Sequence, residues 1–345
     1  MVVLGGKLFL LSPPATKGNA VKLLVTGGAG YVGSVTSRLL LDAGHEVVVL
    51  DNLSTGFREA VAPDATFVQA DIADAAQVLT PGAGFDAVLH FAGLIAAGES
   101  MSKPELYWDH NVIRSLALLS AVRAARVPRL VFSSTAAVYG NPTELPITEN
   151  AVKAPTNTYG ATKLAFDNAL TSETFAHGLA AVSLRYFNVA GALIRPDGTA
   201  IGERHDPETH LIPIALQTAA GKRDKLQLFG DDYPTVDGTC VRDYIHVEDL
   251  ARAHLLALDA ATGGEHKIYH LGNGNGFSNR QVVEAAREVT GAELPIEIAP
   301  RRDGDPATLV AGSQRARDEL GWVPEKNTLP DMIGDAWEFY RTHVA

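Results

Sequence analysis

Cysteine is nearly absent from this chain of 345 residues, because Cys240 is its single one. One cysteine cannot form an intramolecular disulfide, so a reducing compartment fits and we expect the protein in the cytoplasm. No histidine is matched to Cys240 in the sequence, and we therefore expect this thiol to pack rather than to act as a nucleophile.

Long hydrophobic runs and an excess of positive charge are also missing. No window approaches the roughly 20 apolar residues of a membrane span, and the apolar stretch at 8–11 is too short for a secretory signal. The formal net charge of −11 argues against nucleic acid and anionic membranes as partners. Residues 1–20 are expected to form a mobile extension.

Apolar, β-branched segments alternate with helical patterns along the rest of the chain. Such alternation is typical of an α/β fold with a doubly wound parallel sheet, Rossmann-type, that binds its ligand at the carboxyl edge. We expect one such domain over 21–190 and a smaller mixed α/β substrate lobe over 191–345, with 240–271 returning to the first domain. Strands are predicted near 22–26, 46–50, 66–69, 86–90, 129–133, 181–186 and 267–271.

Glycines cluster directly after the first of these strands. Gly27, Gly28, Gly30 and Gly33 stand between the strand and a helical pattern, which is the context a dinucleotide-binding turn requires. Asp51 ends the next strand, where an acidic side chain can accept hydrogen bonds from a ribose 2′-hydroxyl and would repel a 2′-phosphate. The pattern predicts NAD rather than NADP, although a helix-capping role for the Asp is the alternative.

Tyr159 and Lys163 stand four residues apart at a predicted helix start, so both side chains lie on one helical face. A phenol alone titrates near pH ~10, and a nearby cation would bring its pKa toward the working range. Such a pair also occurs by chance on surface helices. The pair indicates catalysis only because a predicted NAD-binding turn lies upstream in the same chain.

Taken together, these residues identify the chain as similar to the extended short-chain dehydrogenases/reductases, and within them to the enzymes that epimerise nucleotide sugars. The resemblance covers roughly residues 21–342. It is carried by 90–94 (HFAGL), 132–135 (FSST), 138–140 (VYG), 185–188 (RYFN), 229–235 (FGDDYPT), 241–247 (VRDYIHV) and 300–305 (PRRDGD).

The resemblance implies reversible interconversion of UDP-galactose and UDP-glucose through a 4-keto sugar, with bound NAD. Tyr159 would be the acid/base at the sugar 4-hydroxyl, and Lys163 would hold the nicotinamide ribose. Thr135 would bond the 4-oxygen in place of the usual Ser, with Ser134 as the fallback hydroxyl. The resemblance also implies a homodimer formed through the helices that open at Pro104 and Tyr159.

Position by position, the resemblance assigns two further sets of residues. The cofactor set is Gly27, Gly30, Tyr31, Val32, Gly33, Asp51, Asn52, Asp71, Ile72, Phe91, Ala92, Gly93 and Lys163. The substrate set is Thr135, Tyr159, Asn188, Leu211, Phe229, Arg242, Arg302 and Asp305. On spacing alone, Arg242 could equally form a surface ion pair with Asp243 or Glu248.

Several positions depart from the family pattern. Ile95 replaces a Lys near the pyrophosphate, Asp109–Val112 replaces an Asn–Asn pair, and His210 replaces an Asn. Leu309 replaces a Tyr beside the sugar, which would leave room for the N-acetyl group of UDP-N-acetylhexosamines unless neighbouring side chains fill the gap.

The sequence argues against two alternative functions and against a metal site. A 4,6-dehydratase would need an acid–base pair directly after Thr135, where this chain has Ala136 and Ala137. A non-catalytic NAD-binding regulator would be expected to lose the Tyr or the Lys. A metal site is not expected, because His266 and His270 lie in a predicted strand without a set of carboxylates or cysteines.

Overall fold

The computed structural model describes residues 2–4, 7–9, 20–302 and 305–344. In the N-terminal extension it gives only β1 (Val2–Leu4) and β2 (Lys7–Phe9), paired antiparallel. The predicted mobility of residues 1–20 therefore concerns a segment that lies largely outside the described residues.

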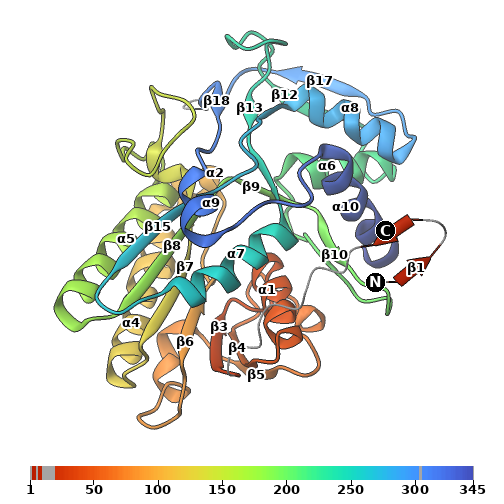
Figure 1. Cartoon of the computed structure of the whole chain (residues 1–345). Coiled ribbons are helices and arrows are strands. Elements are labelled where there is room, and N and C mark those ends of the chain that lie inside the picture. Colours follow the sequence, from red (N-terminus) through yellow and green to blue (C-terminus); the bar gives the residue numbers. More distant parts are fainter. Residues whose placement is uncertain (1, 5–6, 10–19, 303–304, 345) are drawn as a thin grey trace.

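A seven-stranded parallel sheet forms the larger part of the molecule, in the order β15-β8-β7-β6-β3-β4-β5 (Figure 1). This confirms the predicted fold class, and each predicted strand is found within one or two residues of its expected bounds. The strands are β3 (Lys22–Thr26), β4 (Glu46–Asp51), β5 (Thr66–Gln69), β6 (Ala87–His90), β7 (Arg129–Thr135), β8 (Ala180–Tyr186) and β15 (His266–Leu271).

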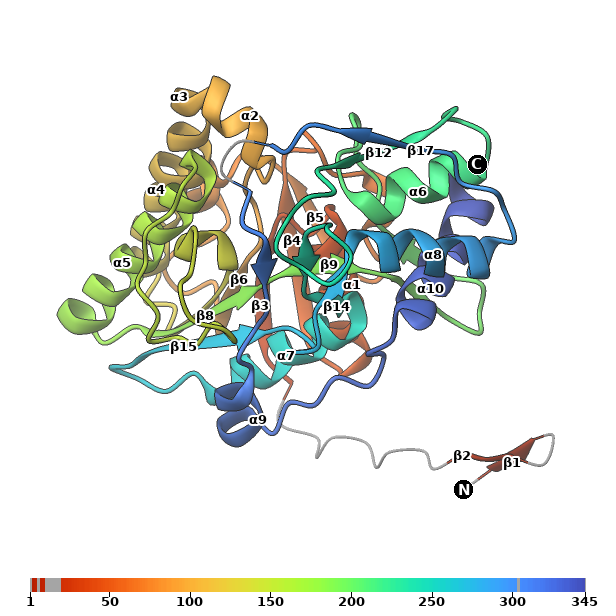
Figure 2. The ribbon, with the colours of Figure 1, turned by 90° about the horizontal axis from the view of Figure 1, so that it is seen from above.

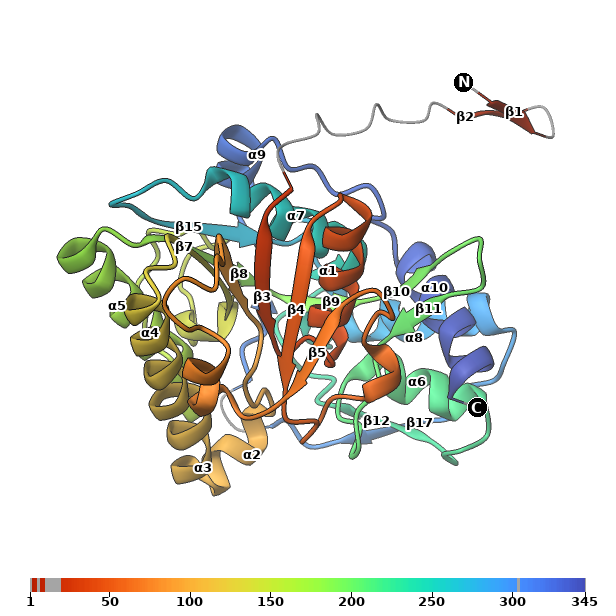
Figure 3. The same ribbon diagram turned by 90° about the horizontal axis from the view of Figure 1, so that it is seen from below.

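Helices cover both faces of this sheet because its side chains alternate between two apolar cores. Leu24 and Val48 face α4 (Arg114–Ala124) and α5 (Thr158–His177), whereas Leu23 and Val25 face α1 (Tyr31–Asp42), α7 (Val247–Ala260) and α9 (Gln314–Leu320). In Figure 3, α4 and α5 lie on the opposite side of β3 and β4 from α1 and α7. Leu116 on α4 stays outside both cores, since it is 42% exposed.

The smaller lobe packs three helices around a separate core. These are α6 (Leu211–Ala219), α8 (Asn279–Thr290) and α10 (Leu329–His343), beside the parallel pair β12 (Leu226–Phe229) and β17 (Ile296–Ala299), as Figure 2 shows. The remaining elements are short and connect or extend the two parts. They are η1 (Arg58–Ala60), η2 (Ile72–Gln77), α2 (Ala97–Ser102), α3 (Pro104–Trp108), η3 (Asp109–Ile113), η4 (Ala136–Tyr139), β9 (Asn188–Ala190), β10 (Ala192–Ile194), β11 (Ala200–Gly202), β13 (Val241–Arg242), β14 (Tyr244–His246), β16 (Phe277–Ser278) and β18 (Thr308–Leu309).

The segment 240–271 joins the large sheet only in part. β15 pairs with β8 at its edge and α7 packs on its face, but β14 pairs with β9, and β13 lies between β16 and β18. The small sheets that hold β13 and β14 therefore connect the two lobes, and the domain boundaries themselves stay a prediction.

Among the described residues, none of the helices is both long enough and apolar enough to cross a bilayer.

We predict that buried histidines make the fold sensitive to acid. Burial lowers the pKa of His90 to about 3 and the pKa values of His254 and His270 to about 4, from an ordinary value of 6.5. The unfolded chain takes up these protons below about pH 6.5 and the folded chain does not. Stability is therefore fully present above pH 6.5 and falls below it by up to about 1.4 kcal/mol per pH unit for each histidine.

Urea unfolding between about pH 7.5 and 5 measures this slope. His254→Gln should reduce it, while His177→Gln, at an exposed helix end, should leave it unchanged. A slope in His254→Gln equal to that of the unaltered protein would contradict the prediction.

Candidate active site

The glycine turn between β3 and α1 forms a cradle into which a side chain would not fit. A Cβ at Gly33 would lie 2.3 Å from the carbonyl oxygen of Gly27, and a Cβ at Gly27 would lie 2.5 Å from the amide nitrogen of Ala92. Gly27 also has φ +71°, a conformation that favours glycine. Gly30 caps α1 without a side-chain hydrogen bond, which leaves the first amides of the helix available to an anion.

Asp51 stands at the end of β4 beside this turn. Its Oδ2 accepts a hydrogen bond from the Ala29 amide at 3.0 Å, and its Oδ1 accepts one from Leu53 at 2.8 Å. Asp51 is 8% exposed, and these bonds fix the orientation of its carboxylate at the carboxyl edge. A carboxylate held beside a glycine turn fits the adenosine ribose of NAD.

Asp71 belongs to a second polar group at the same edge, which includes a residue that the sequence did not reveal. Its Oδ2 accepts from Asn52 at 3.0 Å and from Arg114 at 2.6 Å, while Oδ1 accepts from the Ala73 amide. Burial would raise the pKa of Asp71, but the Ala73 amide, Arg114 and Asn52 together lower it. The sequence did not indicate Arg114 as a site residue, because its partner Asp71 lies 43 residues away along the chain.

The other predicted cofactor residues lie on the elements that border this edge. They are Tyr31 and Val32 at the start of α1, Ile72 at the start of η2, and Phe91, Ala92 and Gly93 directly after β6. Tyr31 reaches the smaller lobe, since its hydroxyl donates to the carbonyl of Gly191 at 2.7 Å.

Tyr159 is placed by the N-terminus of α5. Asn157 caps this helix by accepting from the Gly160 amide at 2.8 Å, and the Tyr159 amide donates to Ser100 at 3.1 Å. Burial raises the pKa of the Tyr159 phenol, and a hydrogen bond with the Thr135 side chain opposes this rise. The structure thus brings Tyr159 and Thr135 together, but the side chains alone do not produce the expected lowering of the pKa by Lys163.

Lys163 lies one turn further along α5 and is 4% exposed. Its Nζ donates to the Ser133 carbonyl on β7 at 3.0 Å and lies 4.8 Å above the Phe132 ring. Burial lowers the pKa of Lys163 to about 8, and the charge of Asp167 partly opposes this effect. Ser134, the fallback hydroxyl, instead donates to Asp167 at 3.2 Å.

Asn111 holds the loop after β6 against α5, and it too was not predicted as a site residue. Its Oδ1 accepts from the Leu94 amide at 2.8 Å, and its Nδ2 donates to the Leu94 carbonyl and to Thr162. Asn111 lies in η3, a π-helical turn of the kind often found at functional sites. A Cβ on Gly93 would lie 3.0 Å from Asn111 Oδ1 and 3.4 Å from Lys163 Nζ, so both side chains lie close to the backbone of this loop.

Four of the predicted substrate residues lie together in two pairs, Arg242 with Asp305 and Arg302 with Phe229. Arg242 Nη2 lies 3.4 Å from Asp305, and its Nη1 donates to the carbonyls of Val241 and Pro306. The ion pairs with Asp243 or Glu248 that spacing allowed are therefore not formed by Arg242. Arg302 lies over the Phe229 ring at 3.8 Å, so this ring faces a guanidinium.

Asn188 and Leu211 complete the predicted substrate set. Asn188 begins β9 and is exposed, and Leu211 is the half-buried first residue of α6. Leu309 pairs with Arg242 and packs beside Val138 and Tyr139, which follow β7. Through Leu309, the predicted nucleotide-sugar residues lie against the region that follows Thr135.

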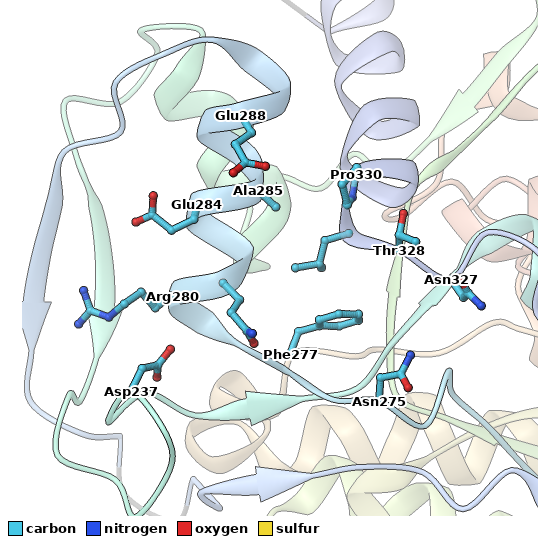
Figure 4. Close-up of a pocket in the computed structure, with 12 residues that line it drawn as sticks. Asp237, Asn275, Phe277, Arg280, Glu284, Ala285, Glu288, Asn327, Thr328 and Pro330 are labelled. Carbon is cyan, nitrogen blue, oxygen red and sulfur yellow. The ribbon is translucent and has the colours of Figure 1, made fainter.

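A separate hollow of about 540 Å³ lies between α8 and the start of α10 (Figure 4). Its lining carries the acidic residues Asp237, Glu284 and Glu288, which would repel a diphosphate, and contains none of the predicted site residues. This hollow is therefore not a candidate for the nucleotide-sugar site.

Comparison with known proteins agrees with this geometry. The model of the NAD dependent epimerase/dehydratase family matches residues 23–272. The chain belongs to this family.

Among its relatives, the UDP-glucose 4-epimerases of Corynebacterium glutamicum and Streptomyces lividans are each 56% identical to it. The alignments cover 94% and 93% of this chain and 99% and 97% of the relatives. A crystal structure of UDP-glucose 4-epimerase from Brucella ovis in complex with NAD is 44% identical and superposes with a TM-score of 0.88. That match covers 93% of this chain and 98% of the other.

We predict that Gly33→Ala abolishes NAD binding, because the added Cβ would overlap the Gly27 carbonyl at 2.3 Å. The NAD content of the purified protein, measured after denaturation, should fall at least about tenfold. Gly334→Ala, on α10 with no atom near the added Cβ, should keep its NAD. Equal NAD content in the two variants would refute this role of the turn.

Proposed function

We propose that this protein is a UDP-glucose 4-epimerase that interconverts UDP-galactose and UDP-glucose. The observation that carries the proposal is the meeting of Tyr159 with Thr135 at the edge of the sheet, beside the glycine cradle. Two relatives that match nearly the whole chain are named UDP-glucose 4-epimerase, which supports the same activity.

The cradle, Asp51 and Lys163 fit NAD, which when bound supplies the hydride acceptor and the positive charge of the nicotinamide. Around it, Gly27 and Gly33 allow close approach of the backbone to the pyrophosphate, and Asp51 holds a ribose. Lys163 is held at the other end by the Ser133 carbonyl, where its ammonium can bond the second ribose.

Tyr159 is the proposed acid and base. It takes the proton of the sugar 4-hydroxyl as C4 is oxidised to the ketone, and it returns that proton when C4 is reduced again on its other face. Bound NAD would supply the hydride chemistry, accepting the hydride in the first half and giving it back in the second. Thr135 bonds the 4-oxygen and orients it toward the phenol. Because its hydroxyl also accepts from the Ala137 amide at 3.1 Å, its donor proton stays free for the sugar or the phenol.

The substrate lobe holds the nucleotide while the sugar turns over. Arg242 and Arg302 present guanidinium groups suited to a diphosphate, and Asp305 can accept from uridine ribose hydroxyls. We infer that Arg242 exchanges its 3.4 Å contact with Asp305 for the diphosphate when substrate binds. Holding only the nucleotide end leaves the keto-sugar free to present either face.

UDP-hexoses are the proposed main substrates and UDP-N-acetylhexosamines the lesser ones. Leu309 is smaller than the tyrosine common at this position, but it packs in a cluster with Val138, Tyr139 and Phe187. These neighbours occupy part of the space that an acetyl group would need. A 4,6-dehydratase is disfavoured by Ala136 and Ala137, which supply no acid or base beside Thr135.

We predict that the purified protein converts UDP-galactose to UDP-glucose without added NAD. Tyr159→Phe should lower kcat by at least about 100-fold through loss of the proton-transferring group, and Thr135→Val should lower it because the hydroxyl is lost. Thr135→Ser keeps the hydroxyl and is the matched control, with activity near that of the unaltered protein.

UDP-N-acetylgalactosamine in the same assay measures substrate preference, with slower turnover expected. No turnover of either sugar, even with NAD added, would reject the proposed function. Full activity in Thr135→Val would remove Thr135 from the mechanism.

We also propose that two copies pair through the helices around α4 and α5, which lie side by side at the outer face in Figures 1 and 3. Four large apolar side chains on these helices are exposed: Trp108 by 41%, Ile113 by 61%, Leu116 by 42% and Phe175 by 93%. A second copy packed against these helices would explain why such side chains are exposed.

Light scattering after size-exclusion chromatography should therefore give a mass of about two chains. Ile113→Glu should shift the protein toward one chain, because a charge would be buried in the contact. Val236→Glu, at an exposed position in the smaller lobe, is the control and should remain dimeric. A single-chain mass for the unaltered protein would exclude this dimer.

A further inference from the structure

Four potential metal ligands converge in the segment between β11 and α6. They are Glu203, His205, Glu208 and His210, and each offers one ligand atom within 4.8 Å of the others. The sequence analysis expected no metal site, but it judged only His266 and His270 as possible ligands. Those rings have other partners, Thr171 and Ser183 for His266, and Tyr139 and Ile147 for His270.

The distances around His205 match those between ligands of a tetrahedral ion. Its Nδ1 lies 3.4 Å from Glu203 Oε1 and 3.5 Å from Glu208 Oε2. Zinc bonds of ~2.0–2.1 Å in tetrahedral geometry separate ligand atoms by roughly 3.3–3.4 Å. His210 Nδ1 lies closer to Glu203, at 2.5 Å, so this one pair would open by roughly 1 Å around an ion.

Within the described part of the chain, the two carboxylates have no Lys or Arg partner, and their ionisable neighbours are the imidazoles of His205 and His210. The side chains of Glu203 and Glu208 are only 7% and 2% exposed. Arg204, which lies between them in sequence, turns away to Glu59 at 2.5 Å and to the Phe57 ring at 3.4 Å. Buried carboxylates are costly unless they are paired or bind a metal, and a divalent cation would neutralise both.

Glu208 is also oriented as a ligand. Its Oε1 accepts from the amides of Thr209 at 2.8 Å and His210 at 2.9 Å. These bonds fix the carboxylate and leave Oε2 directed at His205, in the way that outer hydrogen bonds orient metal ligands.

We propose that Glu203, His205, Glu208 and His210 bind one zinc ion. Two imidazoles and two carboxylates suit zinc, and four protein ligands make a closed, structural site rather than a catalytic one. The ion would fix the segment from β11 to the start of α6. Because His210 directly precedes Leu211, the site would also steady one border of the proposed nucleotide-sugar pocket.

The test uses the full-length protein, purified without a metal-affinity tag from medium containing zinc. Elemental analysis should find about one zinc per chain, and removal by a chelator followed by zinc addition should lower and then restore the melting temperature. His205→Ala and Glu208→Gln should each lose most of the bound zinc. His177→Ala, which removes an exposed histidine beside Glu173, should keep it.

Two results would overturn the proposal. One is that the unaltered protein neither contains zinc nor is stabilised by added zinc, which would mean that a Glu203–His210 ion pair closes the cluster by itself. The other is zinc content in both ligand variants equal to that of His177→Ala, which would place the ion elsewhere. If Glu208→Gln does not fold, His205→Ala alone decides between these outcomes.

Discussion

The buried ion pair between Asp167 and Arg185 determines where α5, the helix that carries Tyr159 and Lys163, lies on the sheet. Asp167 is on α5, one turn after Lys163, and Arg185 is on β8, with contacts of 2.7 and 3.0 Å between them. Both side chains are almost wholly inaccessible to water, at 2% and 1% exposed. Removing either partner would leave an uncompensated charge in the core, so the register of α5 on the sheet is tightly constrained.

Further hydrogen bonds stabilise this buried ion pair and connect it to other elements of the sheet. Arg185 also donates to the Tyr139 hydroxyl at 2.6 Å, and this hydroxyl bonds His270 on β15 at 2.6 Å. Ser134 donates to Asp167 from β7. The network thus joins α5, three strands of the sheet and the turn that follows Thr135. It therefore constrains the relative positions of Tyr159 and Thr135, the two hydroxyls of the proposed mechanism.

A second buried carboxylate, Asp243, joins the lobes in a similar way without a cation. It accepts from the backbone amides of Asn273, Gly274 and Ala311 at 2.8 to 3.0 Å. Burial raises the pKa of Asp243, and these amides oppose the rise. Asp243 directly follows Arg242 in the sequence. Its bonds therefore also fix the strand that carries Arg242, the residue proposed to bind the diphosphate.

Local patterns were sufficient to predict the large sheet, the glycine turn and the Tyr159–Lys163 pair, because their spacing reflects strand and helix periods. They could not reveal Arg114, Asn111 or the Arg302–Phe229 contact, since each depends on chain segments that only tertiary packing brings together. The exposure of Leu116 could not be predicted either, because a helical stripe does not show which of its apolar positions a neighbour covers. The 203–210 cluster was missed for a different reason. Its ligands lie in an irregular segment, where spacing predicts no common face.

The acid–base properties of the site follow from burial more than from the Tyr–Lys spacing that suggested them. In the protein alone, burial raises the pKa of Tyr159 and lowers that of Lys163 to about 8, so both groups are pushed toward their neutral forms. The positive charge of bound NAD would act against the first shift by favouring the phenolate. Thr135 acts in the same direction, since its hydrogen bond is the protein's own contribution to lowering the pKa of the phenol. In the proposed mechanism, the hydroxyl at position 135 would therefore act on the base as well as on the sugar, and a threonine supplies that hydroxyl as a serine would.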